Sequence, residues 1–225
     1  MRQIILDTET TGLHVNQGDR IVEIGCIELL NRSISNKKLH LYINPEKKIS
    51  SESLKIHGLT NDFLSNKPKF IEVVDYFLKF IEDSELIIHN ASFDVNFLNS
   101  ELSRIGKKSI FSTCKKVTDS LSYARKLYPG KRNSLDALCE RYKISNQQRN
   151  FHGALLDSYL LAQIWIIMTR GQEKLITNYG RKNKKIYKLN NSKKNSLSIL
   201  KIQEANKNEL KNHKFYMENI KKNIQ

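Results

Sequence analysis

Three strand-like runs within the first 45 residues constrain the fold of this 225-residue chain more than any other feature. They read RQIILDTE (2–9), RIVEIGCIELL (20–30) and KLHLYINP (38–45), and short polar segments containing Gly18 or Asn36 separate them. Connections this short suit antiparallel pairing, because a parallel crossover needs a dozen or more residues. The sequence therefore predicts an antiparallel meander at the start of the chain.

Helical and extended patterns then follow in alternation. The segment 70–83 has apolar side chains at helical spacing, namely Ile71, Val74, Phe77, Leu78 and Ile81. Residues 85–90 form a short apolar run typical of a buried strand, and a further short strand is expected within 110–120. One more helix is expected from Ser92, as its N-cap, to Gly106, and others over 119–128, 134–144 and 153–171. This order predicts an α/β fold with a mixed sheet flanked by helices.

The basic residues gather toward the C-terminal end. Residues 171–225 contain 14 Lys/Arg against 4 Asp/Glu, whereas the first 170 contain 24 against 19. The chain is long enough for one well-buried domain with an appendage. We therefore predict a folded domain over 1–171, a basic linker over 172–197 and a helical tail over 198–225.

Neither a membrane segment nor a cysteine framework is expected. No run approaches 18 apolar residues, and the N-terminus MRQIILDTET turns acidic too soon for a signal peptide, so the cytosol is the expected compartment. Cys26, Cys114 and Cys139 are odd in number and show no CxxC spacing. Buried free thiols are therefore expected rather than disulfides or a zinc site.

Asp7 and Glu9 end the most apolar early segment, two positions apart. Residues i and i+2 of a strand share a face, so the two carboxylates repel each other unless a cation or solvent compensates them. Three further ionisable groups, Asp94, His152 and Asp157, stand at element boundaries. Each also has an ordinary explanation, such as helix-dipole complementation for Asp94. Asp157, however, interrupts a helix that is apolar nearly all round, and a buried carboxylate needs a partner.

Convergence of the four acids would create a site for two divalent cations. Carboxylate oxygens suit Mg²⁺ or Mn²⁺, and two such ions can clamp the attacking and leaving oxygens of a phosphoryl displacement. Histidine, with an unperturbed pKa of about 6.5, suits proton abstraction from the attacking water. The residues alone thus suggest two-metal hydrolysis of a phosphate ester with His152 as the base.

Three motifs carry a family resemblance. LDTETTG (6–12), HNASFDVNFL (89–98) and HGALLDSYLLA (152–162) resemble the DEDD exonuclease superfamily, in the subgroup with a histidine five residues before the last aspartate. The resemblance implies a ribonuclease H-like fold and 3′–5′ hydrolysis that releases nucleoside 5′-monophosphates. It also implies metal binding by Asp7, Glu9 and Asp157 most directly, by Asp94 through a bound water, and His152 as general base.

A closer likeness covers residues 2–172 almost continuously. The segments 116–144 and 156–172 are similar to the family of epsilon proofreading subunits of bacterial DNA polymerase III. That likeness implies contact with the terminal nucleotide by Glu52 and His57, with additional pocket residues Thr10, Gly12, Asn90 and Phe93. Without the resemblance, His57 would be taken for an ordinary loop residue, and Phe93 for either a core residue or a base-stacking ring.

The resemblance also implies partners. The substrate would be a DNA 3′ end, and the tail would dock on the polymerase alpha subunit. Gln172–Thr177 stands where the family carries a sliding-clamp peptide, but Thr177 replaces its final aromatic residue. A small theta-like subunit is a further expected partner, and the basic linker is either a solvated spacer or a DNA-binding element.

Two other functions stay open at this level. An RNA-directed exonuclease would share the same acids, although a stand-alone enzyme of that kind needs no linker and docking helix. A catalytically idle adaptor within the replisome would bind metal without cleaving DNA. A comparison of cleavage rates on matched DNA and RNA oligonucleotides would test the first alternative. Metal binding without nuclease activity would support the second.

Overall fold

The computed structural model describes residues 1–146, 151–170, 208 and 211. The chain divides into two units, Met1–Ile176 and Thr177–Gln225. Most of the predicted linker and tail, together with the clamp segment Gln172–Thr177, lies outside the described residues. Asn208 and Lys211 are the exceptions, and both are helical and exposed.

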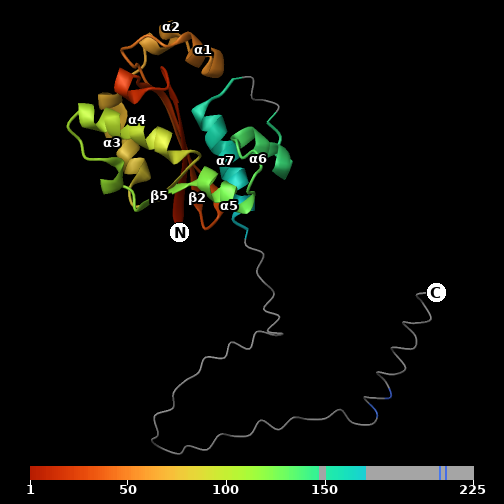
Figure 1. Cartoon of the computed structure of the whole chain (residues 1–225). Coiled ribbons are helices and arrows are strands. Elements are labelled where there is room, and N and C mark those ends of the chain that lie inside the picture. Colours follow the sequence, from red (N-terminus) through yellow and green to blue (C-terminus); the bar gives the residue numbers. More distant parts are fainter. Residues whose placement is uncertain (147–150, 171–207, 209–210, 212–225) are drawn as a thin grey trace, which may run out of the picture. The chain divides into compact units, whose positions relative to one another are not determined.

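A five-stranded mixed sheet forms the centre of the first unit (Figure 1), in the order β3-β2-β1-β4-β5. β1 pairs antiparallel with β2, and β2 with β3, whereas β4 and β5 run parallel to β1. The strands are β1 (Arg2–Thr10), β2 (Ile21–Leu30), β3 (Ser33–Tyr42), β4 (Glu85–Ile88) and β5 (Lys116–Asp119). Both the predicted meander and the predicted mixed sheet are confirmed.

Helices cover both faces of this sheet. Ile4 and Leu6 of β1 point to one face and pack with α3 and α4, while Ile5 points to the other and packs with α5, α6 and α7. Figure 1 shows α3 and α4 on one side of the sheet and α6 and α7 on the other. The helices are α1 (Ser51–His57), α2 (Asn61–Ser65), α3 (Phe70–Ile81), α4 (Ala91–Arg104), α5 (Ser120–Leu127), α6 (Leu135–Tyr142) and α7 (Ala154–Met168), with 3₁₀ turns at Val15–Gln17 and Ile110–Ser112. Among the described residues, every helix is too short or too polar to cross a bilayer.

The turn between β2 and β3 differs from the prediction. Asn36 lies inside β3, and the chain reverses at Asn31 and Arg32, which have φ angles of 49° and 69°. Two consecutive residues with positive φ are the requirement of the tight hairpin turn that matches strand twist. Arg32 is an unusual residue for this conformation, and its guanidinium donates to the Thr169 and Ile166 carbonyls at the end of α7.

Two helix details were also predicted wrongly. The N-cap of α4 is Asn90, with a φ of 66° and no side-chain cap, rather than Ser92, and the Asn90 N–H donates to Asp119 at 3.1 Å. Ile71 is 60% exposed and Phe70 is buried in its place, whereas Val74, Phe77 and Ile81 of the predicted apolar stripe of α3 are buried. The short helices α1 and α2 had no periodic signal and were missed.

Candidate active site

Asp7 and Glu9 lie near the C-terminal end of β1, on the face that α7 covers. Both follow Ile5 at even spacing, and Ile5 packs in the core cluster beneath α7. Their side chains are half-buried. Since β1 is the middle strand and its parallel neighbour β4 ends beside it, elements from both faces can reach this edge.

Gly25 brings Asp157 to the same place. Gly25 lies opposite Asp7 in the β1–β2 register, and the first turn of α7 rests directly on it. A Cβ at Gly25 would stand 2.2 Å from the Ala154 carbonyl carbon, so only glycine permits this approach. The Ser158 hydroxyl donates to the Gly25 carbonyl at 2.9 Å. The close contact between Gly25 and the first turn of α7 therefore fixes the buried Asp157 over Asp7.

Asp94 reaches the site from the opposite face of the sheet. It lies in the first turn of α4, is 3% exposed, and accepts a 2.7 Å hydrogen bond from the Thr8 hydroxyl. Burial raises the pKa of Asp94 to about 7, although the Thr8 hydrogen bond acts in the opposite direction. Thr8 thus positions a carboxylate that the surrounding protein disfavours in its charged form.

His152 approaches from the loop before α7, as its spacing from Asp157 predicted. Its Nδ1 lies 3.4 Å from Asp157 Oδ2, and its imidazole is 46% exposed. Its backbone N–H donates to the Ile56 carbonyl at the end of α1. The imidazole is therefore held beside a buried carboxylate with part of its surface open to solvent.

The four predicted acids form one electrostatic group. Burial, and then repulsion from neighbouring carboxylates, raises the pKa of Asp7 well above its ordinary value. Those neighbours are, in decreasing order of effect, Asp94, Glu9, Asp157 and Glu23. A carboxylate disfavoured in this way gains from a nearby cation, since an opposite charge restores the charged form.

The donor set fits a hard divalent cation. One ligand-type atom each from Glu9, His152 and Asp157 lies within 4.8 Å of the other two. The carboxylate-rich surroundings suit Mg²⁺ or Mn²⁺ better than the thiolate-preferring metals. The three cysteines are buried in the hydrophobic cores as free thiols and do not belong to this cluster of ligand atoms.

Helix α1 carries Glu52 and His57, and its C-terminal end contacts the His152 backbone. His57 is 4% exposed, its Nδ1 accepts from the Leu59 N–H at 3.0 Å, and burial lowers its pKa. Glu52 is exposed in the first turn, where backbone and serine donors lower its pKa. His57 is therefore a neutral, buried imidazole, whereas Glu52 presents a charged carboxylate to solvent.

The remaining predicted pocket residues occupy different surroundings. Thr10 is buried and its hydroxyl donates to the Gly12 carbonyl at 2.7 Å, which closes the turn after β1. A Cβ at Gly12 would stand 2.3 Å from an Asp19 carboxylate oxygen, so an internal contact accounts for this glycine. Phe93 is half-buried and packs against Phe97. Asn90 is exposed at the α4 N-cap.

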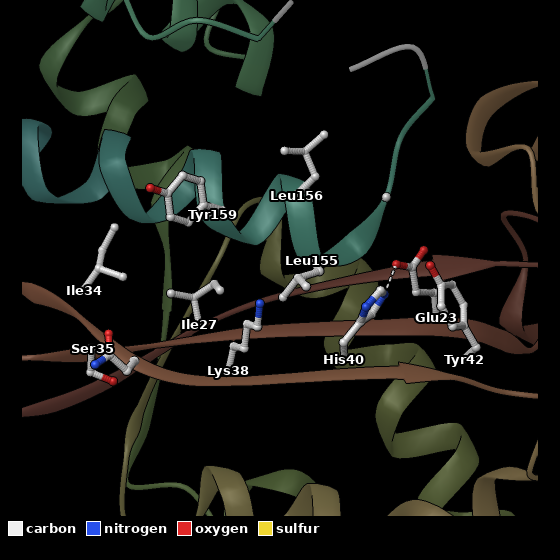
Figure 2. Close-up of a pocket in the computed structure, with 12 residues that line it drawn as sticks. Glu23, Ile27, Ile34, Ser35, Lys38, His40, Tyr42, Leu155, Leu156 and Tyr159 are labelled. Atoms are coloured by element: carbon white, nitrogen blue, oxygen red, sulfur yellow. Dashed lines mark hydrogen bonds and ion pairs between the residues drawn. The ribbon is translucent and has the colours of Figure 1, made fainter. Parts of the chain in front are cut away.

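Glu23 is a buried acid that sequence reasoning missed. It lies opposite Glu9 in the β1–β2 register, is 3% exposed, and bonds to His40 Nε2 at 2.7 Å. Figure 2 shows this pair at one end of a cavity of about 630 Å³ between β2, β3 and α7. The available signal was the antiparallel meander itself, which places a residue of the second strand opposite Glu9.

Comparison with known proteins agrees with this geometry. The exonuclease family model matches residues 4–165. DNA polymerase III subunit epsilon of Buchnera aphidicola subsp. Schizaphis graminum is 48% identical, over 98% of this chain and 97% of the relative. The subunit of the same name from Escherichia coli strain K12 is also 48% identical, over 76% of this chain and 72% of the relative.

Solved structures share the fold. Exonuclease X, in complex with 5′-overhanging duplex DNA, superposes with a TM-score of 0.58 at 26% identity, over 74% of this chain and 90% of that chain. The nuclease domain of 3′hExo, a DEDDh family member bound to rAMP, has a TM-score of 0.64 at 19% identity over the same shares. The predicted ribonuclease H-like fold is confirmed. The chain belongs to the exonuclease family and, within it, to the epsilon subunits of bacterial DNA polymerase III.

Proposed function

We propose that this chain is the 3′–5′ proofreading exonuclease of a bacterial replicative polymerase, and that it removes mispaired 3′-terminal nucleotides as deoxynucleoside 5′-monophosphates. The observation that carries the proposal is the convergence of four carboxylates and one histidine at a single sheet edge, from both faces. Repulsion from each of the three other predicted acids raises the pKa of Asp7. A membership in the epsilon family makes DNA the expected substrate.

Asp7, Glu9 and Asp157 would hold two divalent ions, Mg²⁺ or Mn²⁺, with Asp94 contributing less directly. Bound ions would stabilise the charge that develops on the phosphate and increase the acidity of the attacking water. Two features support this role: Asp94 and Asp157 are buried, and the charged forms of Asp7 and Asp94 are disfavoured when the site lacks positive charge.

His152 would act as the general base. It accepts one proton from the attacking water on an imidazole nitrogen while the new phosphorus–oxygen bond forms. The 3′ oxygen of the penultimate nucleotide leaves and takes a proton from solvent. Asp157, 3.4 Å from Nδ1, stabilises the imidazolium that results. The exposed side of the ring gives the proton a path back to solvent.

The terminal nucleotide would be contacted by Glu52 and His57, with Thr10, Gly12, Asn90 and Phe93 lining its pocket. His57 fits a donor role, because its Nδ1 already accepts from Leu59 and the remaining nitrogen of a neutral ring then carries the proton. Phe93 is half-buried and offers an aromatic side chain for stacking.

A first experiment follows the shortening of a 5′-labelled single-stranded DNA by the purified full-length chain. With Mg²⁺ or Mn²⁺ we expect a ladder that starts at the 3′ end and a mononucleotide product, and with excess chelator we expect no cleavage. A matched RNA strand should be degraded more slowly. Cleavage that persists in chelator, or a strong preference for RNA, would contradict the proposal.

The C-terminal part of the chain supports a second element of the proposal, which is assembly with the polymerase in a cytoplasmic replisome. Residues 198–225 would dock on the alpha subunit and 172–197 would act as a linker, with Gln172–Thr177 as a clamp contact and a theta-like subunit on the core. Basic character and helical spacing support this assignment.

Truncation tests that assignment. We expect the full chain to co-purify with a polymerase alpha subunit and a chain ending at residue 179 to lose that association while it keeps its nuclease activity. Retained activity serves as the folding control, because all predicted site residues precede the truncation. Unchanged association after truncation would place the docking surface elsewhere.

A further inference from the structure

We propose that Phe151 and the C-terminal end of α1 form a latch that positions His152, so that the helix carrying the nucleotide contacts also sets the position of the base. The inference rests on the proposed role of His152 and extends it to a residue with no predicted role. Phe151 is here a positioning residue, since its described contact is with protein.

The latch has a backbone component. The His152 N–H donates to the Ile56 carbonyl at 2.9 Å, although the two residues are 96 positions apart in the chain. Ile56 lies in the last turn of α1, where carbonyl groups have no intrahelical partner. One such carbonyl therefore receives its hydrogen bond from the loop that carries the base.

The latch also has a side-chain component. The Phe151 ring lies over Gly58, the C-cap of α1, and a Cβ at Gly58 would stand 3.1 Å from both Cγ and Cδ1 of the ring. Gly58 has a φ of 70°, which glycine adopts without strain. Gly58 thus ends α1 and leaves room for the ring at the same time.

The other end of α1 is anchored to the sheet. The Ser50 side chain caps the helix by accepting from the Ser53 N–H, and the Ser50 N–H donates to the Thr11 carbonyl at 2.9 Å, directly after β1. His57, buried beneath the helix, closes the following turn through its bond to Leu59. Because α1 is tied to β1, it offers a firm support for His152.

The arrangement explains why an aromatic ring that is 57% exposed precedes the base. Such a ring removes one part of its surface from water by covering the backbone of Gly58, and this contact restrains rotation of the adjacent His152 backbone. A catalytic group that moves by about 1 Å loses roughly 100-fold in rate, so a restraint of this kind is functionally important.

The test compares steady-state kinetics of full-length variants on single-stranded DNA with Mg²⁺. Phe151→Ala should lower kcat between about 10- and 100-fold and leave KM within about twofold. Phe151→Tyr keeps the ring and should restore kcat. Phe111→Ala is the matched control, because Phe111 is 59% exposed in the turn Ile110–Ser112 and should leave both constants unchanged.

A spectroscopic readout separates positioning from a general effect on folding. In protein labelled at its histidines, the ring resonances of His152 should shift or broaden in Phe151→Ala, while those of His40 should stay in place. Unchanged His152 resonances would overturn the latch, as would a rise in KM without a fall in kcat, which would indicate direct contact of the ring with DNA.

His152→Ala, measured in parallel, distinguishes the two levels of the inference. If His152→Ala is impaired and Phe151→Ala retains full kcat, the latch is wrong and the proposed base stands. If His152→Ala retains full kcat, the proposed base itself is wrong, and the latch fails with it.

Discussion

Asp7→Asn should lower kcat for release of the 3′-terminal nucleotide by about three orders of magnitude, because it removes a charged ligand that contributes several kcal/mol to transition-state stabilisation. Asn preserves the size of the side chain, so the loss would report on charge. Asp75→Asn is the control, since Asp75 pairs with Lys107 on the surface and is 83% exposed. Comparable loss in both variants would contradict the central role of Asp7.

The same substitution should stabilise the protein when metal is absent. Burial and the neighbouring acids raise the pKa of Asp7 well above its ordinary 3.8, so its ionised form destabilises the fold. With chelator at neutral pH, Asp7→Asn should therefore unfold at a higher temperature than the original chain. Activity and stability would move in opposite directions, which a simple folding defect cannot produce.

The pH dependence of this difference has a definite sign. A carboxyl whose pKa is higher in the folded state loses its stabilising contribution as pH rises from the unfolded value through the folded one. In chelator, the contributions of Asp7 and Asp94 to stability should thus be lost as pH rises above about 4, that of Asp94 up to about pH 7. The stability difference between Asp7→Asn and the original chain should therefore widen over this range. Added Mg²⁺ should flatten the curve of the original chain, and equal slopes in chelator would contradict the assignment.

Gly25→Ala should damage the site without altering any predicted ligand. Its Cβ would stand 2.2 Å from the Ala154 backbone, so the start of α7 must move away from the sheet. We expect a loss of about 1–3 kcal/mol in the free energy of unfolding from this overpacking. We also expect kcat to fall about 100-fold or more, because Asp157 moves with the helix relative to Asp7.

Gly106→Ala provides the matched control for that experiment. Gly106 has a φ of 69° and no atom within 4 Å of a Cβ placed there, so alanine costs backbone strain of about 1 kcal/mol without a clash. It lies just beyond α4, at the end opposite Asp94. A stability loss of similar size with normal kcat would show that Gly25 acts through helix position. Equal loss of activity in both variants would contradict this explanation.

Local patterns in the sequence determined much of this protein. The meander, the α3 and α7 helices and the five ionisable residues proposed for chemistry are all readable from spacing, because strand alternation and helical periodicity depend on neighbours in the chain. Asp7 and Glu9 could be placed on one face for the same reason. The prediction of metal-dependent hydrolysis started from two carboxylates, Asp7 and Glu9, at the end of an apolar strand.

The tertiary structure decided what holds those residues together. The two short helices α1 and α2 have no periodic signal, so the place of His57 and the contact between Ile56 and His152 became visible only in the fold. The role of Gly25 depends on a backbone 129 positions away, and that of Glu23 on strand register. Residue spacing determines which groups an element presents, whereas packing between distant elements determines which of them meet, because that contact depends on the whole fold.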